Sequence, residues 1–544
     1  MTRASISTLL SASMSRRRAL GAAGSSALLA ASGCCSLRGF PDNQIGATER
    51  AEFGTPLKPV PFVPQGLGQK RIDVHAHFFN ASDVTVRGYL EGPVAHDMAE
   101  PLASLVRALG PVADELAGIA PTAAQEFHDL QTLLMQPAML SSTAREDALI
   151  ALKRTQRADA SRRFYEAVRN TSFKTQFDEI AAGEAAQLAP MGLAPAVRAL
   201  GPESLQQAMD HGLNPGNVVT YSARLSASKV PYSGGILEFV GYMLSSRWAN
   251  LHSYGQAFTS SQGSYGINMT LGALVDFDRW LECPPRSSHD DQVKLHQLLS
   301  MLSGGYMRPL VAYNPWSDIK EEGKALARVV DAVQTRGFVG VKLYPPNGFR
   351  PFGNTESPQP PGPGPSAADL DRVLAQFWDA SISLGVPVMS HTGQTMGRDD
   401  AHDNLGGPKG WQALMTRYAG RKAPIINLGH FGGDCDVNTW TDEMSTLMAS
   451  QDGKTVYGDV AYWSRLGVGN DGSSCGDARA RLARAVQHPG VAQRVMYGSD
   501  WLMLSRERDW ARFPFQVEQA SAGVVDRDAL FGGNAQRCFG TLLT

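Results

Sequence analysis

Cysteine is scarce in this chain, and its spacing argues against one kind of metal site. The 544 residues include six cysteines, of which Cys34 and Cys35 are adjacent near the N-terminus. The other four are far apart in the sequence: Cys283, Cys435, Cys475 and Cys538. Since no CxxC pair occurs, the spacing does not predict a zinc site built from thiolates. One or two disulfides could form in an oxidising compartment, but the sequence does not say which cysteines pair.

A surplus of charge and long apolar runs are also missing. The formal net charge is −2, so the chain lacks the basic surplus that would recruit a nucleic acid by bulk charge. After the first 35 residues, no apolar run reaches the roughly 20 residues of a membrane span. The composition, 43% apolar and 19% charged, is that of a globular protein. The length fits two to four ordinary domains, or one large barrel with an insertion.

Residues 1–35 have the pattern of an export signal. Three arginines, Arg16, Arg17 and Arg18, precede an uncharged stretch that runs to residue 33. The sequence "SRRRAL" at 15–20 resembles a twin-arginine motif. The sequence "ASGC" at 31–34 resembles a bacterial lipobox with Cys34 as the lipidated residue. We therefore predict an exported protein of the periplasm or cell envelope, which a lipid on Cys34 could anchor to the membrane.

The middle of the chain is predicted to be a helical insertion. Residues 36–70 are rich in proline and glycine, as in "PLKPVPFVPQGLGQ", and are predicted to be a linker. Residues 80–265 contain no convincing strand, and stretches such as "TAAQEFHDLQTLLMQ" have apolar residues at helical spacing. This region therefore separates a first strand, at 71–79, from the rest of the fold.

From about residue 266, short apolar runs alternate with helical patterns. This alternation predicts βα units and a parallel sheet. Together with the run at 71–79 we count eight strands, which predicts a (β/α)8 TIM barrel over 71–79 and 266–544, with the large helical insertion after strand one. A doubly wound open sheet is the alternative, but the sequence has no GxGxxG fingerprint to support it.

Polar side chains interrupt several of these strands near their ends. In "RIDVHAHFFN" at 71–80, the two histidines are two residues apart and lie on the same side of a strand. Because the carboxyl ends of barrel strands meet at one mouth, all such side chains should converge there. Imidazole nitrogens and carboxylate oxygens are ligands of Zn²⁺ and similar ions. The predicted metal-site residues are His75, His77, Lys342, His391, His430 and Asp500.

Local sequence around these residues resembles a known family. The segments "DVHAHF", "NLGHFGG", "RVMYGSDW" and "FGGNAQRCFG" resemble the amidohydrolase-related branch of the amidohydrolase superfamily, which includes aminocarboxymuconate-semialdehyde decarboxylase. The segment "VKLYPP" resembles the dihydroorotase strand whose lysine is carbamylated. The resemblance covers residues 71–79 and about 266–540, and does not extend to the insertion or the export segment.

The resemblance implies that these strand-end residues hold one or two divalent metal ions, with zinc the first expectation. In a binuclear design, a carbamylated Lys342 bridges two ions and Asp500 carries a proton to the leaving group. In a mononuclear design, Lys342 is unmodified and His430 is free to activate water. Asp500 and His430 are therefore the predicted catalytic residues.

The expected reaction is hydrolysis of an amide, lactam, lactone or ester bond in a small molecule. A metal-dependent decarboxylase is the alternative, and a non-catalytic metal-binding protein of the envelope is a third. In the long proline-rich loop after strand four, Arg350 could bind a substrate carboxylate. In the loop after strand five, Gln394 is a second candidate for substrate binding. The sequence does not indicate the oligomeric state.

Overall fold

The computed structural model describes residues 71–89, 117–136, 142–169, 236–259, 266–278, 284–356, 364–393, 400–435, 439–467, 475–507 and 510–543. Within these residues the centre of the fold is a sheet of eight parallel strands, in the order in which they occur along the chain. The strands are β1 (Ile72–Ala76), β2 (Met269–Ala273), β3 (Met307–Tyr313), β4 (Gly340–Leu343), β5 (Val388–His391), β6 (Ile426–Gly429), β7 (Val456–Asp459) and β8 (Val495–Met496). Each coincides with one of the eight predicted apolar runs.

The sheet closes on itself between the first strand and the segment that follows the last. The Val74 amide donates to the Tyr497 carbonyl at 3.1 Å, and the Asp500 amide donates to the His75 carbonyl at 2.7 Å. An isolated parallel bridge joins Ala76 to Trp501 one step further along. The predicted TIM barrel is therefore confirmed, and closure leaves no strand edge exposed.

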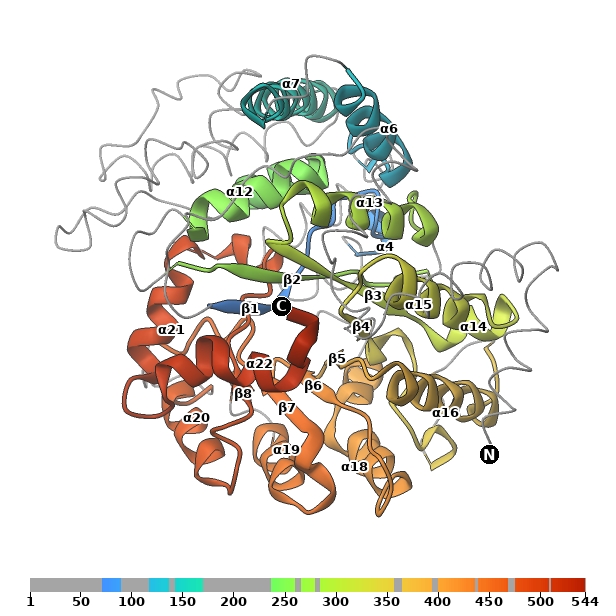
Figure 1. Cartoon of the computed structure of the whole chain (residues 1–544), viewed down its shortest axis with the longest axis vertical. Coiled ribbons are helices and arrows are strands. Elements are labelled where there is room, and N and C mark those ends of the chain that lie inside the picture. Colours follow the sequence, from blue (N-terminus) through green and yellow to red (C-terminus); the bar gives the residue numbers. More distant parts are fainter. Residues whose placement is uncertain are drawn as a thin grey trace, which may run out of the picture.

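Helices cover the outside of the barrel, as Figure 1 shows. They follow the strands in the sequence: α13 (His289–Leu302), α14 (Pro315–Lys320), α15 (Lys324–Thr335), α16 (Ala367–Leu384), α17 (Asp400–Asp403), α18 (Pro408–Arg417), α19 (Trp440–Ala449), α20 (Ala478–Gln487), α21 (Phe513–Ser521) and α22 (Asn534–Phe539). In α15 the apolar side chains recur at helical spacing, so that Ala325, Val329, Ala332 and Val333 are buried against the sheet. Strand residues are buried on both faces, as expected for a parallel sheet enclosed by helices.

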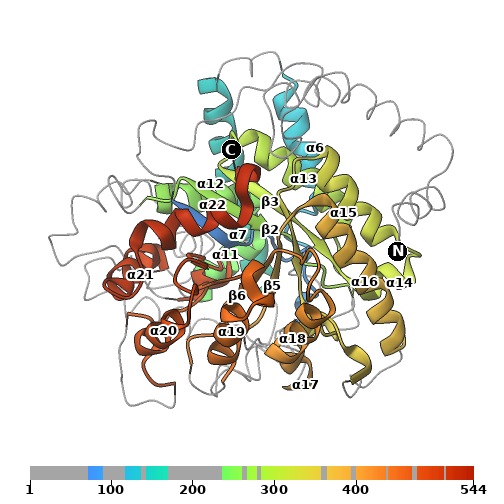
Figure 2. The same ribbon diagram turned by 60° about the horizontal axis from the view of Figure 1, so that its bottom comes forward.

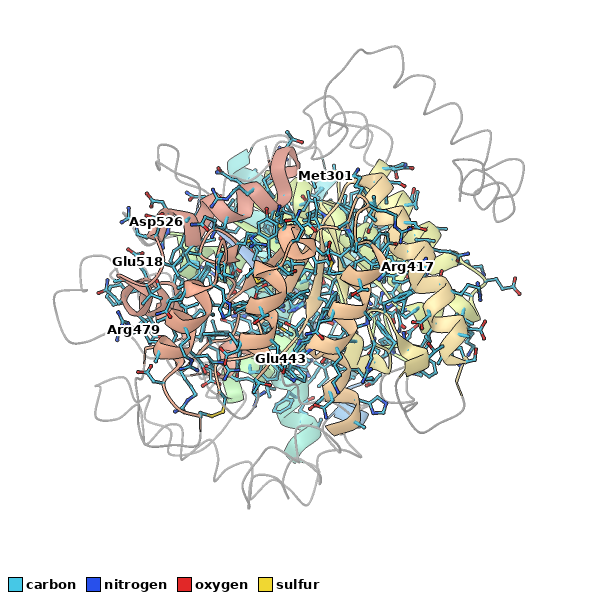
Figure 3. The ribbon with its side chains drawn as sticks, turned by 90° about the horizontal axis from the view of Figure 1, so that it is seen from below. Met301, Arg417, Glu443, Arg479, Glu518 and Asp526 are labelled. Atoms are coloured by element: carbon cyan, nitrogen blue, oxygen red, sulfur yellow. A yellow bond between two sulfur atoms is a disulfide. The ribbon has the colours of Figure 1, made fainter. Side chains whose placement is uncertain are left out.

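The two ends of the barrel can be told apart in Figure 3. Met301 belongs to α13, which leads into β3, and Glu443 belongs to α19, which follows β6. Met301 lies in the upper part of this view and Glu443 in the lower part. The end that carries Glu443 is therefore the one where the strands finish and where the predicted site residues should lie.

The described parts of residues 80–265 are helical. They form α4 (Val86–Tyr89), α6 (Ala123–Leu134), α7 (Ser142–Arg169), α11 (Ile236–Leu244) and α12 (Arg247–Thr259), and Figure 1 shows α6 and α7 outside α12 and α13. A buried ionic network joins three of these segments. Arg247 at the start of α12 donates to Asp83 at 2.5 and 2.8 Å, and to Glu126 of α6 at 3.0 Å. The guanidinium fork thus ties the chain that leaves β1 to α6 and α12.

Two loops at the strand-end side are joined by a disulfide between Cys435 and Cys475. Cys435 follows β6 and Cys475 precedes α20, so the bond links the loops after β6 and β7. Cys538 is a buried free thiol, and Cys283 lies outside the described residues. Figure 2 shows α18, α19 and α20 side by side along this part of the barrel.

Across the described ranges no helix is both long and apolar enough to cross a membrane. The predicted export segment, its Cys34 and the linker at 36–70 lie outside these ranges.

Candidate metal centre

Three of the predicted residues come together at the junction of β1 and the segment after β8. The His77 Nε2 atom lies 3.3 Å from Asp500 Oδ1, and the His75 Nε2 atom lies 3.7 Å from the same oxygen. One donor atom from each of the three side chains lies within 4.8 Å of the others, which is close enough to hold one metal ion. All three residues are buried. Closure of the barrel therefore completes the group, because Asp500 and the histidines are more than 400 residues apart in the chain.

The second nitrogen of each of these histidine rings is held by an acceptor. The Nδ1 atom of His77 lies 2.8 Å from the carbonyl oxygen of Ala273 at the end of β2. The Nδ1 atom of His75 lies 3.2 Å from both carboxylate oxygens of Asp459. Since a carbonyl or a carboxylate only accepts, Nδ1 carries the hydrogen in both rings and Nε2 keeps its lone pair. This is the form in which a histidine binds a metal.

Lys342 projects from β4 into the same group. Its Nζ atom lies 3.0 Å from His75 Nε2, the nitrogen that is free to bind a metal. Burial lowers the pKa of Lys342 to about 8, although the carboxylates of Asp500 and Asp459 favour its charged form. The lysine is therefore a buried amine placed directly beside a candidate ligand, as the sequence predicts.

His391 and His430 complete the cluster from β5 and from the residue after β6. Their ring centroids are 4.4 Å apart, and the His430 ring is 4.7 Å from that of His75. His430 donates from Nδ1 to the carbonyl oxygen of Ala461 at 2.9 Å, so its Nε2 is left with a lone pair. In His391 the held nitrogen is Nε2, which lies 3.2 Å from the Gly393 carbonyl, so Nδ1 is its free nitrogen. The structure thus brings all six predicted metal-site residues into one buried cluster.

Burial sets the charges of the cluster. The pKa values of His75, His77 and His391 are lowered chiefly because burial disfavours the charged ring. For Asp500, burial acts in the opposite direction, but the proximity of His77, His430 and His75 outweighs it and lowers the pKa of the carboxyl group to about 2. Neutral imidazoles and an ionised carboxylate are the protonation states that metal binding requires, so the donor set fits a divalent ion such as Zn²⁺ or Mn²⁺.

Backbone strain is concentrated at the same strand ends. Five described residues other than glycine have a positive φ, and four of them follow β6, β7 or β8: His430 (67°), Phe431 (44°), Tyr462 (57°) and Asp500 (56°). Such conformations cost roughly 1–3 kcal/mol each and persist where the surrounding structure enforces them. Two of the four, His430 and Asp500, are predicted site residues whose side chains lie in the cluster.

Of the two predicted substrate-binding residues, only Arg350 lies among the described residues. Arg350 lies half-buried between Asn347 and Asn354, and its backbone amide donates to the Asn354 side chain at 2.8 Å. Within the described parts of the chain its guanidinium makes no ion pair. Gln394 lies outside the described residues. Both remain predictions.

Several groups that contact the metal-site residues were not predicted from the sequence. The backbone carbonyls of Ala273 and Ala461 give no signal, because any residue type could supply them. The ring of Tyr344, 5.0 Å from that of His391, follows β4 and could have been inferred from its place at a strand end. Glycines also precede the functional residues in "NLGHF" and "YGSDW", and glycine in a strand often marks close approach of another group.

A second group of possible ligands lies beyond β2. Donor atoms of Asp276, Asp278 and His289 are within 4.8 Å of one another, and His289 Nε2 is 3.1 Å from Asp276 Oδ1. Asp276 also binds Asn314 through its side chain and Asn347 through its carbonyl oxygen. This ion pair and its amide partners hold the ends of β2, β3 and β4 together, which accounts for the group as a structural one.

The fold and the cluster together define a TIM-barrel protein with a histidine- and aspartate-rich candidate metal centre at the strand ends. Part of the chain also matches a known protein family. Residues 308–541 match the family model described as Amidohydrolase. No curated protein matches the chain significantly.

Three of the solved structures that resemble this chain are described here with their source organisms. An uncharacterised TIM-barrel protein from Bordetella bronchiseptica is 12% identical, with 60% of this chain and 91% of that chain covered and a TM-score of 0.36. A 2,6-dihydroxybenzoate decarboxylase from Rhizobium is 14% identical (50% and 84% covered, TM-score 0.33). A probable 2-pyrone-4,6-dicarboxylic acid hydrolase from Acinetobacter baumannii is 13% identical (50% and 84% covered, TM-score 0.29).

Proposed function

We propose that this protein is a metal-dependent hydrolase that cleaves an amide, lactam, lactone or ester bond in a small molecule. The observation that carries the proposal is the position of Lys342, whose buried amine lies 3.0 Å from the metal-facing nitrogen of His75. A charged ammonium beside a metal ion would be repelled, so the lysine must be neutral or modified when the site is loaded. Reaction of the neutral amine with CO₂ would give a carbamate and release a proton, and the carbamate would convert the repulsive neighbour into a bridging ligand.

The metal would be held by the six clustered residues. A divalent ion bound there would lower the pKa of water and polarise a carbonyl oxygen. His75, His77 and Asp500 already offer three convergent donor atoms, while His391 and His430 form a second pair whose ring centroids are 4.4 Å apart. Two such groups of donors would suit two ions.

Asp500 and His430 are proposed to handle the proton. Asp500 is ionised, and its Oδ1 faces the two histidines of β1, so it can accept a proton from water and pass it to the leaving group. If a single ion is bound and His430 is not one of its ligands, the Nε2 atom of His430 would be the nitrogen that receives a proton from water, because Nδ1 is held by the Ala461 carbonyl. Both residues have a strained backbone, which fits a role that depends on the direction of the side chain.

Metal content per chain tests the proposal. Protein purified without chelators would be analysed by plasma mass spectrometry as wild type, as Lys342→Ala, and as Lys153→Ala, which removes a buried lysine from α7 outside the barrel. We expect about two ions per wild-type chain, fewer in Lys342→Ala, and the wild-type content in Lys153→Ala. One ion per chain that survives Lys342→Ala would exclude the lysine from the site and favour decarboxylation, which release of CO₂ from candidate acids would then test.

We also propose that the protein works in the cell envelope. The export pattern of residues 1–35 supports this location, and so does the Cys435–Cys475 disulfide, because disulfides persist in oxidising compartments. Fractionation of the producing cells, with and without the Cys34→Ala change, would test both export and the lipid anchor. Protein found only in the cytoplasm would refute the proposal.

A further inference from the structure

One carboxylate at the end of β7 is surrounded by hydrogen-bond donors. Asp459 is fully buried, and its Oδ1 accepts from the backbone amides of His430 at 3.0 Å and Ala461 at 3.1 Å. Its Oδ2 accepts from the side-chain amide of Asn427 at 2.7 Å. The Nδ1 atom of His75 lies 3.2 Å from both oxygens. Four donors from β1, β6 and β7 thus converge on a single acceptor, which has no hydrogen of its own to offer while it is ionised.

The ring of His75 has no room to take another position. A methyl group at Gly429 would lie 2.8 Å from Cε1 of this ring, and one at Gly498 would lie 2.8 Å from its Cβ. The side chain of His75 is therefore enclosed by two glycines, Gly429 at the ring and Gly498 at Cβ, with the carboxylate of Asp459 beside Nδ1 and Lys342 beside Nε2. With the ring enclosed in this way, the acceptor at Nδ1 decides which nitrogen carries the hydrogen.

The same carboxylate supports the backbone of His430. His430 has a φ of 67°, which a residue with a side chain adopts only at a cost. The hydrogen bond from its amide to Asp459 offsets part of that cost and directs the ring toward His75 and His391. A change at Asp459 would therefore reach two of the six metal-site residues at once.

We infer that Asp459 is a positioning residue that fixes the Nδ1–H tautomer of His75 and the strained backbone of His430, and so couples the β1 ligands to the β6 histidine. The inference deepens the proposed function and rests on it for its metal-binding consequence. Asp73, another buried carboxylate of the barrel, shows the contrast. It accepts from the His75 amide at 3.0 Å, from Ser499 and from Tyr254, but touches no histidine ring. Asp459 is thus the carboxylate that acts on the ring itself.

Graded substitutions separate the charge of Asp459 from its role as an acceptor. In Asp459→Asn an oxygen remains for the two backbone amides, and Asn427, whose Oδ1 has no hydrogen-bond partner among the described residues, can turn over to accept from the new amide. In Asp459→Ala no acceptor remains. Asp318→Ala is the matched control, because Asp318 is a buried carboxylate that accepts from the Leu326 amide and the Tyr313 hydroxyl away from the cluster.

Two measurements would be made on the full-length protein. Zinc affinity, from competition with a fluorescent chelator, should fall about 10-fold in Asp459→Asn and about 100-fold in Asp459→Ala, the range found when a carboxylate behind a metal-binding histidine is removed. The 15N spectrum of metal-free protein labelled at histidine, with the His75 signal assigned by its loss in His75→Gln, should show Nδ1 protonated in the wild type and a mixture of tautomers in Asp459→Ala. Asp318→Ala should lower the melting temperature and leave both readouts unchanged.

Unchanged zinc affinity and an unchanged His75 tautomer in Asp459→Ala would overturn the inference. Equal losses in Asp459→Ala and Asp318→Ala would also overturn it, because the effect would then be general destabilisation. If the wild type binds neither zinc nor manganese, the proposed function fails, and the tautomer in the metal-free protein still decides the inference.

Discussion

Replacement of Gly429 by alanine should disturb the candidate metal centre by pushing against the ring of His75. The added methyl group would lie 2.8 Å from His75 Cε1 and 2.8 Å from the backbone oxygen of Ser390. Both distances are well below the roughly 3.5 Å at which carbon atoms attract one another. Neither neighbour can move freely, because Ser390 is paired in the β5–β6 ladder, and His75 is held by close packing of its Cβ against Gly498 and by Asp459 at Nδ1.

The expected size of the effect follows from these contacts. Overpacking of a buried site costs about 1–3 kcal/mol, and two rigid neighbours place this site near the upper end. Alanine also restricts the unfolded chain, which returns about 0.4–1 kcal/mol when its backbone conformation is allowed. The net loss of unfolding free energy should therefore be about 2 kcal/mol, and zinc affinity should fall because the displaced ring is a candidate ligand.

Gly467→Ala is the matched comparison for this prediction. A methyl group at Gly467 would have a single neighbour, at 3.9 Å, so this variant should be as stable as the wild type or slightly more stable. Urea unfolding of the metal-free proteins and zinc competition would measure both effects. If Gly429→Ala unfolds at the same urea concentration as Gly467→Ala and binds zinc like the wild type, the packing around His75 argued here is wrong.

Two further predictions concern the frame around the site. Replacement of Cys435 and Cys475 by serine should lower the unfolding free energy by about 4 kcal/mol, because the disulfide closes a loop of 40 residues. Urea unfolding with and without reductant would measure the loss. Equal unfolding midpoints for the wild type and the double variant would contradict this prediction. Burial disfavours the charged ring of His289, but the charge of Asp276 outweighs it and raises the pKa of His289 in the folded protein. The ion pair should therefore stabilise the fold fully below about pH 6.5 and lose this contribution as the pH rises through the higher folded pKa. The difference in melting temperature between the wild type and His289→Gln should accordingly shrink between pH 6 and pH 9, and a constant difference would refute the assignment.

Much of the barrel could be predicted because local sequence carried the information. Each of the eight strands is a short apolar run between helical patterns, and chain order equals sheet order in this fold. The six metal-site residues could be proposed together because each is a polar residue at the end of a strand. Arg350 and Gln394 were proposed only because they lie in loops after strands, and the conformation of a loop does not follow from the local sequence pattern. The structure leaves Arg350 without an ion pair within its described part.

What the sequence by itself determined is which side chains could meet, since the parallel topology sends every strand end to one mouth. What only the tertiary structure decided is how they meet. The placement of Lys342 beside His75, the carbonyls that hold His77 and His430, and the convergence of four donors on Asp459 depend on contacts across separate strands. Such contacts are set by barrel closure and by packing at distances of about 3 Å, where a small shift removes a hydrogen bond. A one-dimensional pattern repeats with the geometry of a single strand or helix and therefore carries no record of them.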